Sequence, residues 1–237
     1  MTSLEKTLII VPAFNEQDAL PSTLDELKRV VGDIDVVVVD DGSADATSEV
    51  ARRHGVVCLT LPFNLGVGGA LRTGFQYAVR HNYQRAIQFD ADGQHDPTQI
   101  AAILQALDNG ADMAIGSRFL GTGDYQVGRS RGAAMGILRW SITKLAGQKF
   151  TDTSSGFRAF NEPVIEFFAK DMPIEYLGDT VEALVLACRA GFKVTEVPVT
   201  MRTRAGGQAS NRRFKLVYNY LRVLVSLIVL PSKRKVK

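Results

Sequence analysis

Short apolar runs that alternate with helical patterns are the feature that most limits how this chain can fold. The clearest run is 35–40, where four consecutive valines stand between two aspartates, a pattern typical of strands buried on both faces of a parallel sheet. Strands and helices in alternation predict an α/β fold with a mostly parallel, doubly wound sheet. The expected strands are 7–11, 35–40, 56–61, 85–89, 111–115 and 193–199; the expected helices are 18–31, 44–54, 64–81, 129–147, 179–190 and 211–230; a Gly-rich loop is expected at 121–128 and a turn at 153–158.

Polar loops come directly after four of these strands, at 12–16, 40–43, 90–96 and 116–118. The carboxyl ends of parallel strands meet at one edge of a sheet, and ligands of doubly wound folds bind there. The sequence therefore predicts one ligand site that is built from four loops.

The loop at 90–96 is the richest in carboxylates. Asp90 and Asp92 follow an apolar run, and two residues apart in an extended segment they would face the same side. Oxygen ligands of this kind suit Mg²⁺ or Mn²⁺, which also bind phosphate oxygens. The alternative is an acidic loop that caps the helix beginning at Pro97. The convergence of four polar loops favours the ligand site.

Two other classes of phosphate-binding enzyme are excluded by the position of the glycines. A dinucleotide-binding fold would have Gly-x-Gly-x-x-Gly after its first strand, but residues 12–16 read PAFNE. A Gly-x-x-x-x-Gly-Lys-Ser/Thr phosphate loop is also missing from the sequence. The glycine cluster at 66–69 follows the third expected strand, which is the wrong place for either motif.

Composition fits an ordinary globular protein with a sizeable core, since 46% of the 237 residues are hydrophobic and 22% are charged. The cysteine usage indicates reduced thiols in a cytosolic setting. The cysteines, Cys58 and Cys188, lie far apart and form no Cys-x-x-Cys pair, which argues against a disulfide framework or a zinc site. The N-terminus lacks a basic region followed by a long apolar run, so no secretory signal is expected.

Seven short motifs, in this order, resemble the family 2 glycosyltransferases of the GT-A fold. Five are general to the family: VPAFNE (11–16), VDDGS (39–43), NLG (64–66), DADGQH (90–95) and GSRF (116–119). SGFRAF (155–160) and EVPV (196–199) are similar to the polyprenyl-phosphate branch, the dolichyl-phosphate mannose or glucose synthases. The resemblance covers roughly residues 7 to 210, which implies a single GT-A domain over 1–210 followed by a C-terminal segment over 211–237.

The resemblance also implies roles for individual residues. Asp41 would accept hydrogen bonds from the nucleobase, and a Mg or Mn cofactor would neutralise the charge that grows on the leaving diphosphate. Arginine forks suit phosphate contacts, so the acceptor would be held by cationic side chains. The implied nucleotide site is Pro12, Phe14, Glu16, Val39, Asp41 and Ala91; the metal and diphosphate site is Asp90, Asp92 and Gln94; the residues that act in transfer are Asp92, Arg118, Arg131 and Arg204.

The implied activity is inverting transfer of a sugar from a GDP-mannose or UDP-glucose type of donor to a polyprenyl phosphate. If the acceptor were instead a saccharide hydroxyl, a general base would be needed, and Asp152, Asp179 and Glu182 are the candidates. The sequence departs from the branch at two acceptor positions, because no lysine follows Arg204 within 207–210 and Met135 replaces a serine. A non-catalytic nucleotide-sugar binding protein and a nucleotidyltransferase are further alternatives.

The C-terminal segment is strongly basic. Ten of the 28 Lys and Arg residues follow Glu196, after which no Asp or Glu occurs, and this leaves 18 basic against 25 acidic side chains up to that point. The apolar stretch 216–230 is shorter than the roughly 20 residues of a membrane span. An amphipathic helix on an anionic, cytosolic membrane surface is expected, with packing on the domain itself as the alternative. A separate membrane protein is a possible partner, and no nucleic-acid recognition motif accompanies the basic residues.

Overall fold

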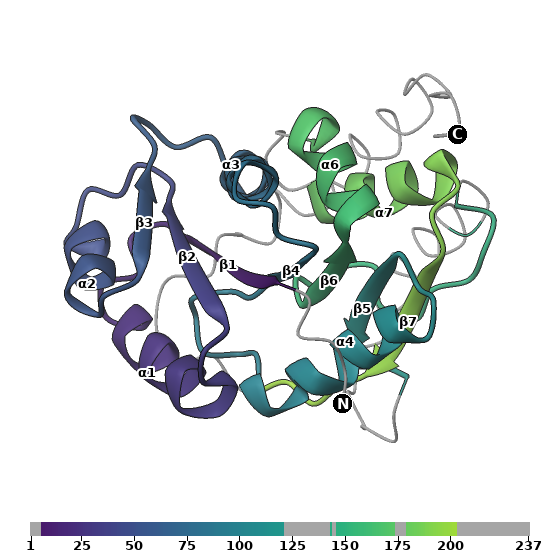
Figure 1. Ribbon diagram of the computed structural model, residues 1–237, viewed down its shortest axis with the longest axis horizontal. Helices are drawn as coiled ribbons and strands as arrows, with labels where there is room; N and C mark the ends of the chain where they lie inside the picture. Colours follow the sequence, from purple (N-terminus) through teal and green to yellow (C-terminus); the bar gives the residue numbers. More distant parts are fainter. Residues whose placement is uncertain (1–5, 121–142, 144–145, 174–178, 203–237) are drawn as a thin grey trace, which may run out of the picture.

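Seven strands form one sheet in the order β3-β2-β1-β4-β6-β5-β7 in the part of the chain that the computed structural model describes, namely residues 6–120, 143, 146–173 and 179–202 (Figure 1). Neighbouring strands are parallel except where β6 pairs antiparallel with β4 and β5. The expected mostly parallel α/β sheet is thus confirmed. The strands are β1 (Thr7–Ala13), β2 (Asp35–Asp40), β3 (Val57–Thr60), β4 (Arg85–Gln88), β5 (Met113–Ser117), β6 (Arg158–Asn161) and β7 (Val194–Pro198).

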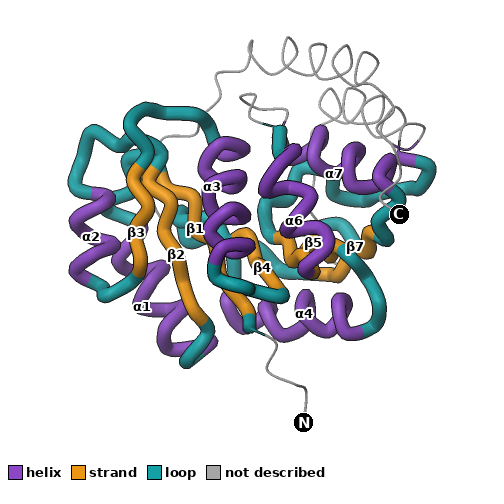
Figure 2. Tube along the Cα trace, turned by 45° about the horizontal axis from the view of Figure 1, so that its top comes forward, coloured by secondary structure: helices purple, strands orange, loops and turns teal. Residues whose placement is uncertain are grey.

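Helices cover both faces of this sheet (Figures 1 and 2). They are α1 (Leu20–Val31), α2 (Thr47–Arg53), α3 (Val67–Arg80), α4 (Ile100–Asp108), α6 (Glu162–Asp171) and α7 (Asp179–Ala190), with a short 3₁₀ helix at Pro97–Gln99. On one face α3, α6 and α7 bury an aromatic cluster in which the Phe75 ring lies 5.0 Å from Phe160 and 5.8 Å from Phe168. On the other face α1, α2 and α4 bury mainly aliphatic side chains. Burial on both faces explains the continuous valine run of β2.

The strand β6 is the main departure from the expected outline. The sequence pattern predicts a turn over 153–158 with no strand after it, yet Arg158–Asn161 enters the sheet between β4 and β5. In the register of the sheet, Arg158 lies opposite Gln88 on one side and Ile115 on the other. A strand of four residues is too short to show the alternating sequence pattern by which strands are predicted. The helix α6, which follows β6, was not expected either.

The remaining expected strands and helices begin and end within a few residues of their predicted bounds where the structure describes them. The helix at 179–190 ends as predicted, with Gly191 at a positive φ of 93°. The loop at 121–128, most of the helix at 129–147 and the helix at 211–230 lie outside the described residues. None of the helices in the described ranges is long and apolar enough to cross a membrane.

Candidate active site

The loops after β1 and β2 are joined by hydrogen bonds at the carboxyl edge of the sheet. The backbone amide of Asn15 donates to Ser43 Oγ at 2.9 Å, and that of Glu16 donates to Thr47 Oγ1 at 2.9 Å. In return the amide of Ala44 donates to Asn15 Oδ1, also at 2.9 Å. Asn15 has a positive φ of 54°, a conformation that Asn tolerates better than most residues. Two of the four predicted loops therefore form one continuous surface.

The residues implied for the nucleotide site differ widely in exposure. Phe14 is 43% exposed, so its ring is available to a ligand. Val39 is fully buried and Pro12 is buried as well. Because these two side chains are buried, any direct contact of the two residues with a ligand would come from their backbone. Ala91 is also buried, and its carbonyl accepts a hydrogen bond from Thr23 Oγ1 of α1 at 2.9 Å.

Asp41 holds the loop that precedes α3. Its two carboxylate oxygens accept hydrogen bonds from the backbone amides of Leu65 at 2.7 Å and Gly66 at 2.8 Å. Burial raises the pKa of the Asp41 carboxyl, and these two amides oppose the shift. The NLG motif at 64–66 is thus the structural partner of VDDGS. A nucleobase would have to use the remaining lone pairs of the same carboxylate.

Asp90 and Asp92 lie in the loop that follows β4, which ends at Gln88, and a turn begins at Ala91. The expected order of strand, polar loop and helix start is therefore present here, and the two carboxylates belong to the loop. Asp92 is 8% exposed, and its Oδ1 accepts a hydrogen bond from the amide of Gln94 at 3.1 Å. The Asp90 side chain is 36% exposed. The two carboxylates therefore differ in exposure and in their hydrogen-bond partners.

Three residues that sequence reasoning missed surround Asp90. Gln88 Nε2 lies 3.4 Å from Asp90 Oδ1, and buried His95 accepts the Asp90 amide at Nδ1 (3.1 Å) and places Nε2 3.5 Å from Oδ2. A Cβ on Gly156 would lie 2.6 Å from Asp90 Oδ2, so a larger residue there would displace the Asp90 carboxylate. His95 packs on Phe157, with ring centroids 4.9 Å apart. The DADGQH and SGFRAF motifs supplied a signal for His95 and Gly156, but only the sheet order brings them together.

The donor atoms around this turn fit a hard divalent cation. Asp90, Asp92 and Gln94 offer two carboxylates and an amide oxygen within five residues. Among the described residues no group of three or more His, Cys, Asp or Glu side chains is arranged to hold a metal ion by itself. Mg²⁺ commonly binds one or two carboxylates and completes its shell with phosphate oxygens and water. The site therefore suits a cation that arrives together with a diphosphate.

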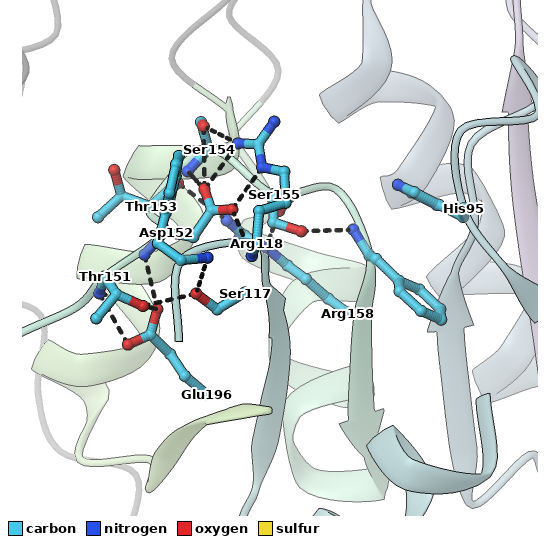
Figure 3. Close-up of polar contacts among 12 residues, drawn as sticks. His95, Ser117, Arg118, Thr151, Asp152, Thr153, Ser154, Ser155, Arg158 and Glu196 are labelled. Atoms are coloured by element: carbon cyan, nitrogen blue, oxygen red, sulfur yellow. Dashed lines mark hydrogen bonds and ion pairs between the residues drawn. The ribbon is translucent and has the colours of Figure 1, made fainter. Parts of the chain in front are cut away.

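A second polar cluster lies after β5, and Figure 3 shows its side chains pointing toward one another. Arg118 donates from Nε and Nη2 to the two oxygens of Asp152, at 2.7 and 2.8 Å, and from Nη2 to Ser154 Oγ at 2.7 Å. The Asp152 side chain is fully buried, whereas that of Arg118 is 27% exposed. This bidentate ion pair joins the end of β5 to the turn before β6.

The ion pair argues against Asp152 as a general base. Burial alone would raise the pKa of its carboxyl, but hydrogen bonds and charge from Arg118 outweigh burial and hold the pKa below its usual range. A carboxylate with a lowered pKa is a weak proton acceptor. Of the other candidate bases, Glu182 is 6% exposed, and the side chain of Asp179 lies outside what the structure describes.

The lowered pKa predicts how the stability of the protein depends on pH. The pair stabilises the folded state at pH values above the ordinary Asp pKa of 3.8, and that stabilisation is lost as the pH falls through the lower folded pKa. We expect Asp152→Asn to reduce the free energy of unfolding most at pH 5–7, and the difference from wild type to shrink below about pH 4. Urea unfolding at pH 7, 5, 4 and 3 measures this, and a difference that stays constant would contradict it.

Arg202 ties the chain that leads to Arg204 onto the carboxylate turn. Its backbone amide donates to the carbonyl of Gln94 at 2.9 Å. Its Nη1 contacts both oxygens of Glu26 on α1, at 2.9 and 2.8 Å, and its Nη2 lies 3.1 Å from Asp96 Oδ1. Arg204 follows two residues later and, like Arg131, lies outside the described residues.

Known glycosyltransferases are similar to this chain in sequence and in fold. The family model described as Glycosyl transferase family 2 matches residues 8–167. The chain is 32% identical over 213 residues to the undecaprenyl-phosphate mannosyltransferase of Micrococcus luteus, with 86% of each chain covered. It is 30% identical over 213 residues to the polyprenol monophosphomannose synthase of Mycolicibacterium smegmatis, with 86% of this chain and 80% of the relative covered.

A solved structure supports the fold. The glucosyl-3-phosphoglycerate synthase of Mycobacterium tuberculosis, in complex with Mn²⁺, UDP and phosphoglyceric acid, superposes with a TM-score of 0.72 at 17% identity. The match covers 99% of this chain and 81% of that chain. Because the family model spans more than half of the sequence and the relatives cover most of it, the chain belongs to family 2 of the glycosyltransferases and is an enzyme of the GT-A fold.

Proposed function

We propose that this glycosyltransferase moves a sugar from a nucleoside-diphosphate donor to a polyprenyl phosphate, with inversion at the anomeric carbon. The observation that carries the proposal is the placement of the Asp90–Gln94 turn and of Arg118 at the ends of β4 and β5, which only β6 separates. In this proposal the residues for a cation and diphosphate and the cationic Arg118 lie at the same edge of the sheet, one strand apart. The names of the two mannosyl-transferring relatives support a lipid phosphate acceptor.

In this proposal Asp90, Asp92 and Gln94 hold Mg²⁺ or Mn²⁺, which would neutralise charge on the leaving nucleoside diphosphate. Phe14 and Asp41 bind the nucleoside, and Pro12, Glu16, Val39 and Ala91 shape its site. Mn²⁺ and UDP in the superposed synthase support a divalent cation.

The acceptor side needs cations and no general base. A phosphate monoester is already an anion, and its oxygen attacks the anomeric carbon as the bond from that carbon to the diphosphate oxygen breaks. Arg118, with Arg131 and Arg204, orients the phosphate and offsets its charge beside the donor. A saccharide acceptor would need a base, and Asp152 is held in an ion pair instead.

We further propose that the enzyme works at the cytosolic face of a membrane. Residues 211–237 carry eight of the ten basic side chains that follow Glu196. A basic amphipathic helix binds anionic lipid surfaces through both its charge and its apolar side. Attachment there would bring the active site to its lipid acceptor, with or without a separate membrane protein.

Thermal shift with nucleoside diphosphates tests the donor site. GDP or UDP with Mn²⁺, at about 100 times its Kd, should stabilise the protein by about 2.7 kcal/mol. For a chain of this length that corresponds to a rise in Tm of about 5–10 °C. When GDP and UDP are compared at one equal concentration, the nucleotide that gives the larger shift identifies the donor base. No shift with either nucleotide, or an equal shift in EDTA, would contradict a metal-assisted diphosphate site.

A further inference from the structure

We propose that Glu196 and Asp152 are positioning residues that set the orientation of Arg118 toward the acceptor phosphate. The inference rests on the proposed function, because Arg118 is placed on the acceptor there. Glu196 belongs to the EVPV motif at 196–199, for which neither the sequence nor the proposed mechanism supplied a role. The three residues come from β7, from the turn before β6 and from the end of β5 (Figure 3).

Glu196 fixes the backbone of that turn. Its Oε1 accepts hydrogen bonds from the amide of Asp152 at 2.7 Å and from Thr151 Oγ1 at 2.8 Å. The amide of Thr151 lies 2.9 Å from Oε1 and 2.8 Å from Oε2. Hydrogen bonds to an ionised acceptor are stronger than those between neutral groups. One carboxylate on a sheet strand therefore holds two consecutive residues of the turn in place.

Asp152 then fixes the guanidinium. Two contacts from one side of the fork, at Nε and Nη2, define the plane of the Arg118 group, and Ser154 Oγ adds a third. A further hydrogen bond joins the turn to β5 itself, because Ser117 Oγ lies 2.6 Å from Thr151 Oγ1. Arg118 is thus held both by the strand β5 that it directly follows and by the turn that Glu196 anchors.

The exposures show which part of this cluster faces solvent. The side chain of Asp152 is fully buried, whereas 27% of that of Arg118 is exposed. An arginine loses much rotamer freedom when it is fixed, and here folding has already fixed it before any ligand binds. Pre-organisation of this kind favours affinity, because binding no longer has to order the side chain. The acceptor would meet a guanidinium that is already oriented.

Steady-state kinetics with farnesyl phosphate and the preferred nucleotide sugar test the proposal. Asp152→Asn and Glu196→Gln should raise the KM for farnesyl phosphate at least tenfold and leave the KM for the donor within twofold. Breaking a buried ion pair can unfold a protein, so Ser154→Ala, at an exposed residue, provides a milder variant. It should raise the acceptor KM two- to threefold.

Asp112→Asn is the matched control. Asp112 also bridges backbone and side chain within this sheet, accepting from the amide of Lys193 at 2.7 Å and from Asn161 Nδ2 at 2.8 Å. It precedes β5, at the end of the strand opposite Arg118. A purely structural loss there should lower Tm and leave both KM values unchanged.

The outcomes separate the two proposals. If the wild-type enzyme transferred no sugar to farnesyl phosphate or to longer polyprenyl phosphates, the proposed function would be overturned and this inference with it. A wild-type enzyme that uses them, while Glu196→Gln and Ser154→Ala leave the acceptor KM unchanged, would overturn the inference alone. Equal increases in donor and acceptor KM would also overturn it, because they would indicate a general structural effect.

Discussion

Replacing Asp92 with asparagine should lower kcat/KM for sugar transfer by about 10³-fold or more, equivalent to about 4 kcal/mol of lost transition-state stabilisation. Asn removes the negative charge that would hold the cation beside the diphosphate. It keeps an oxygen that can accept the Gln94 amide, so the turn itself should persist. Product formation with saturating Mn²⁺, together with Tm from circular dichroism, measures the effect.

Asp96→Asn is the matched control in the same loop. Asp96 caps the 3₁₀ helix, accepting from the amide of Thr98 at 3.0 Å, and Asn caps helices as well as Asp does. It also pairs with Arg202, an exposed contact of small energetic value. We expect activity within about fivefold of wild type. Equal losses of activity in both variants would show that the activity depends on the total negative charge of the loop. Asp92 would then have no specific role as a metal ligand.

The predictable part of this molecule follows from local pattern. The valine run of β2 and the polar residues after β1, β2, β4 and β5 indicated a parallel sheet with a ligand edge, and the structure confirms that sheet. Parallel topology alone brings strand ends together, so the joined loops at Asn15 and Ser43 could be anticipated. Asp90 and Asp92 were predicted as site residues because four polar loops converge on one edge of the sheet, although a helix-capping loop was the alternative.

The part that could not be predicted depends on β6. A four-residue antiparallel strand has no period to detect, and its insertion between β4 and β5 is a choice of topology. That insertion places Gly156 against Asp90. It also carries the turn that contains Asp152 toward Arg118, two residues to which sequence reasoning gave separate roles. The contacts are tertiary, and residues 34 positions apart in sequence leave no local signal.

Gly156→Ala should lower activity about 10²-fold with little loss of stability. The added Cβ would lie 2.6 Å from Asp90 Oδ2, so that oxygen must move, whereas Gln88 Nε2 at 3.0 Å needs to shift only slightly. The Asp90 side chain is 36% exposed, so its carboxylate can swing toward solvent and relieve the clash at low cost. A displacement of about 1 Å at a catalytic group can reduce the rate by about 10²-fold. Turnover and Tm of the purified variant measure the two effects separately.

Gly74→Ala separates this local effect from crowding in general. A Cβ on Gly74 of α3 would press on Ile10 of β1, which is fully buried, so the strain stays in the core. Overpacking costs about 1–3 kcal/mol, of which the better helix propensity of Ala offsets up to about 1 kcal/mol. The Tm of this variant should fall by a few degrees while its activity per folded molecule is retained.

The two glycines thus predict opposite pairs of results, because one added methyl meets the partly exposed carboxylate of Asp90 and the other meets the buried side chain of Ile10. If Gly156→Ala kept full activity, the Asp90 carboxylate would tolerate displacement and its place in the cation site would be wrong. If both variants lost stability and activity together, the turn before β6 would act as part of the core. The Gly156→Ala result would then give no evidence on the proposed cation site at Asp90. A loss of activity confined to Gly156→Ala, accompanied by a higher Mn²⁺ requirement, is the result that identifies β6 as the element that aligns Asp90.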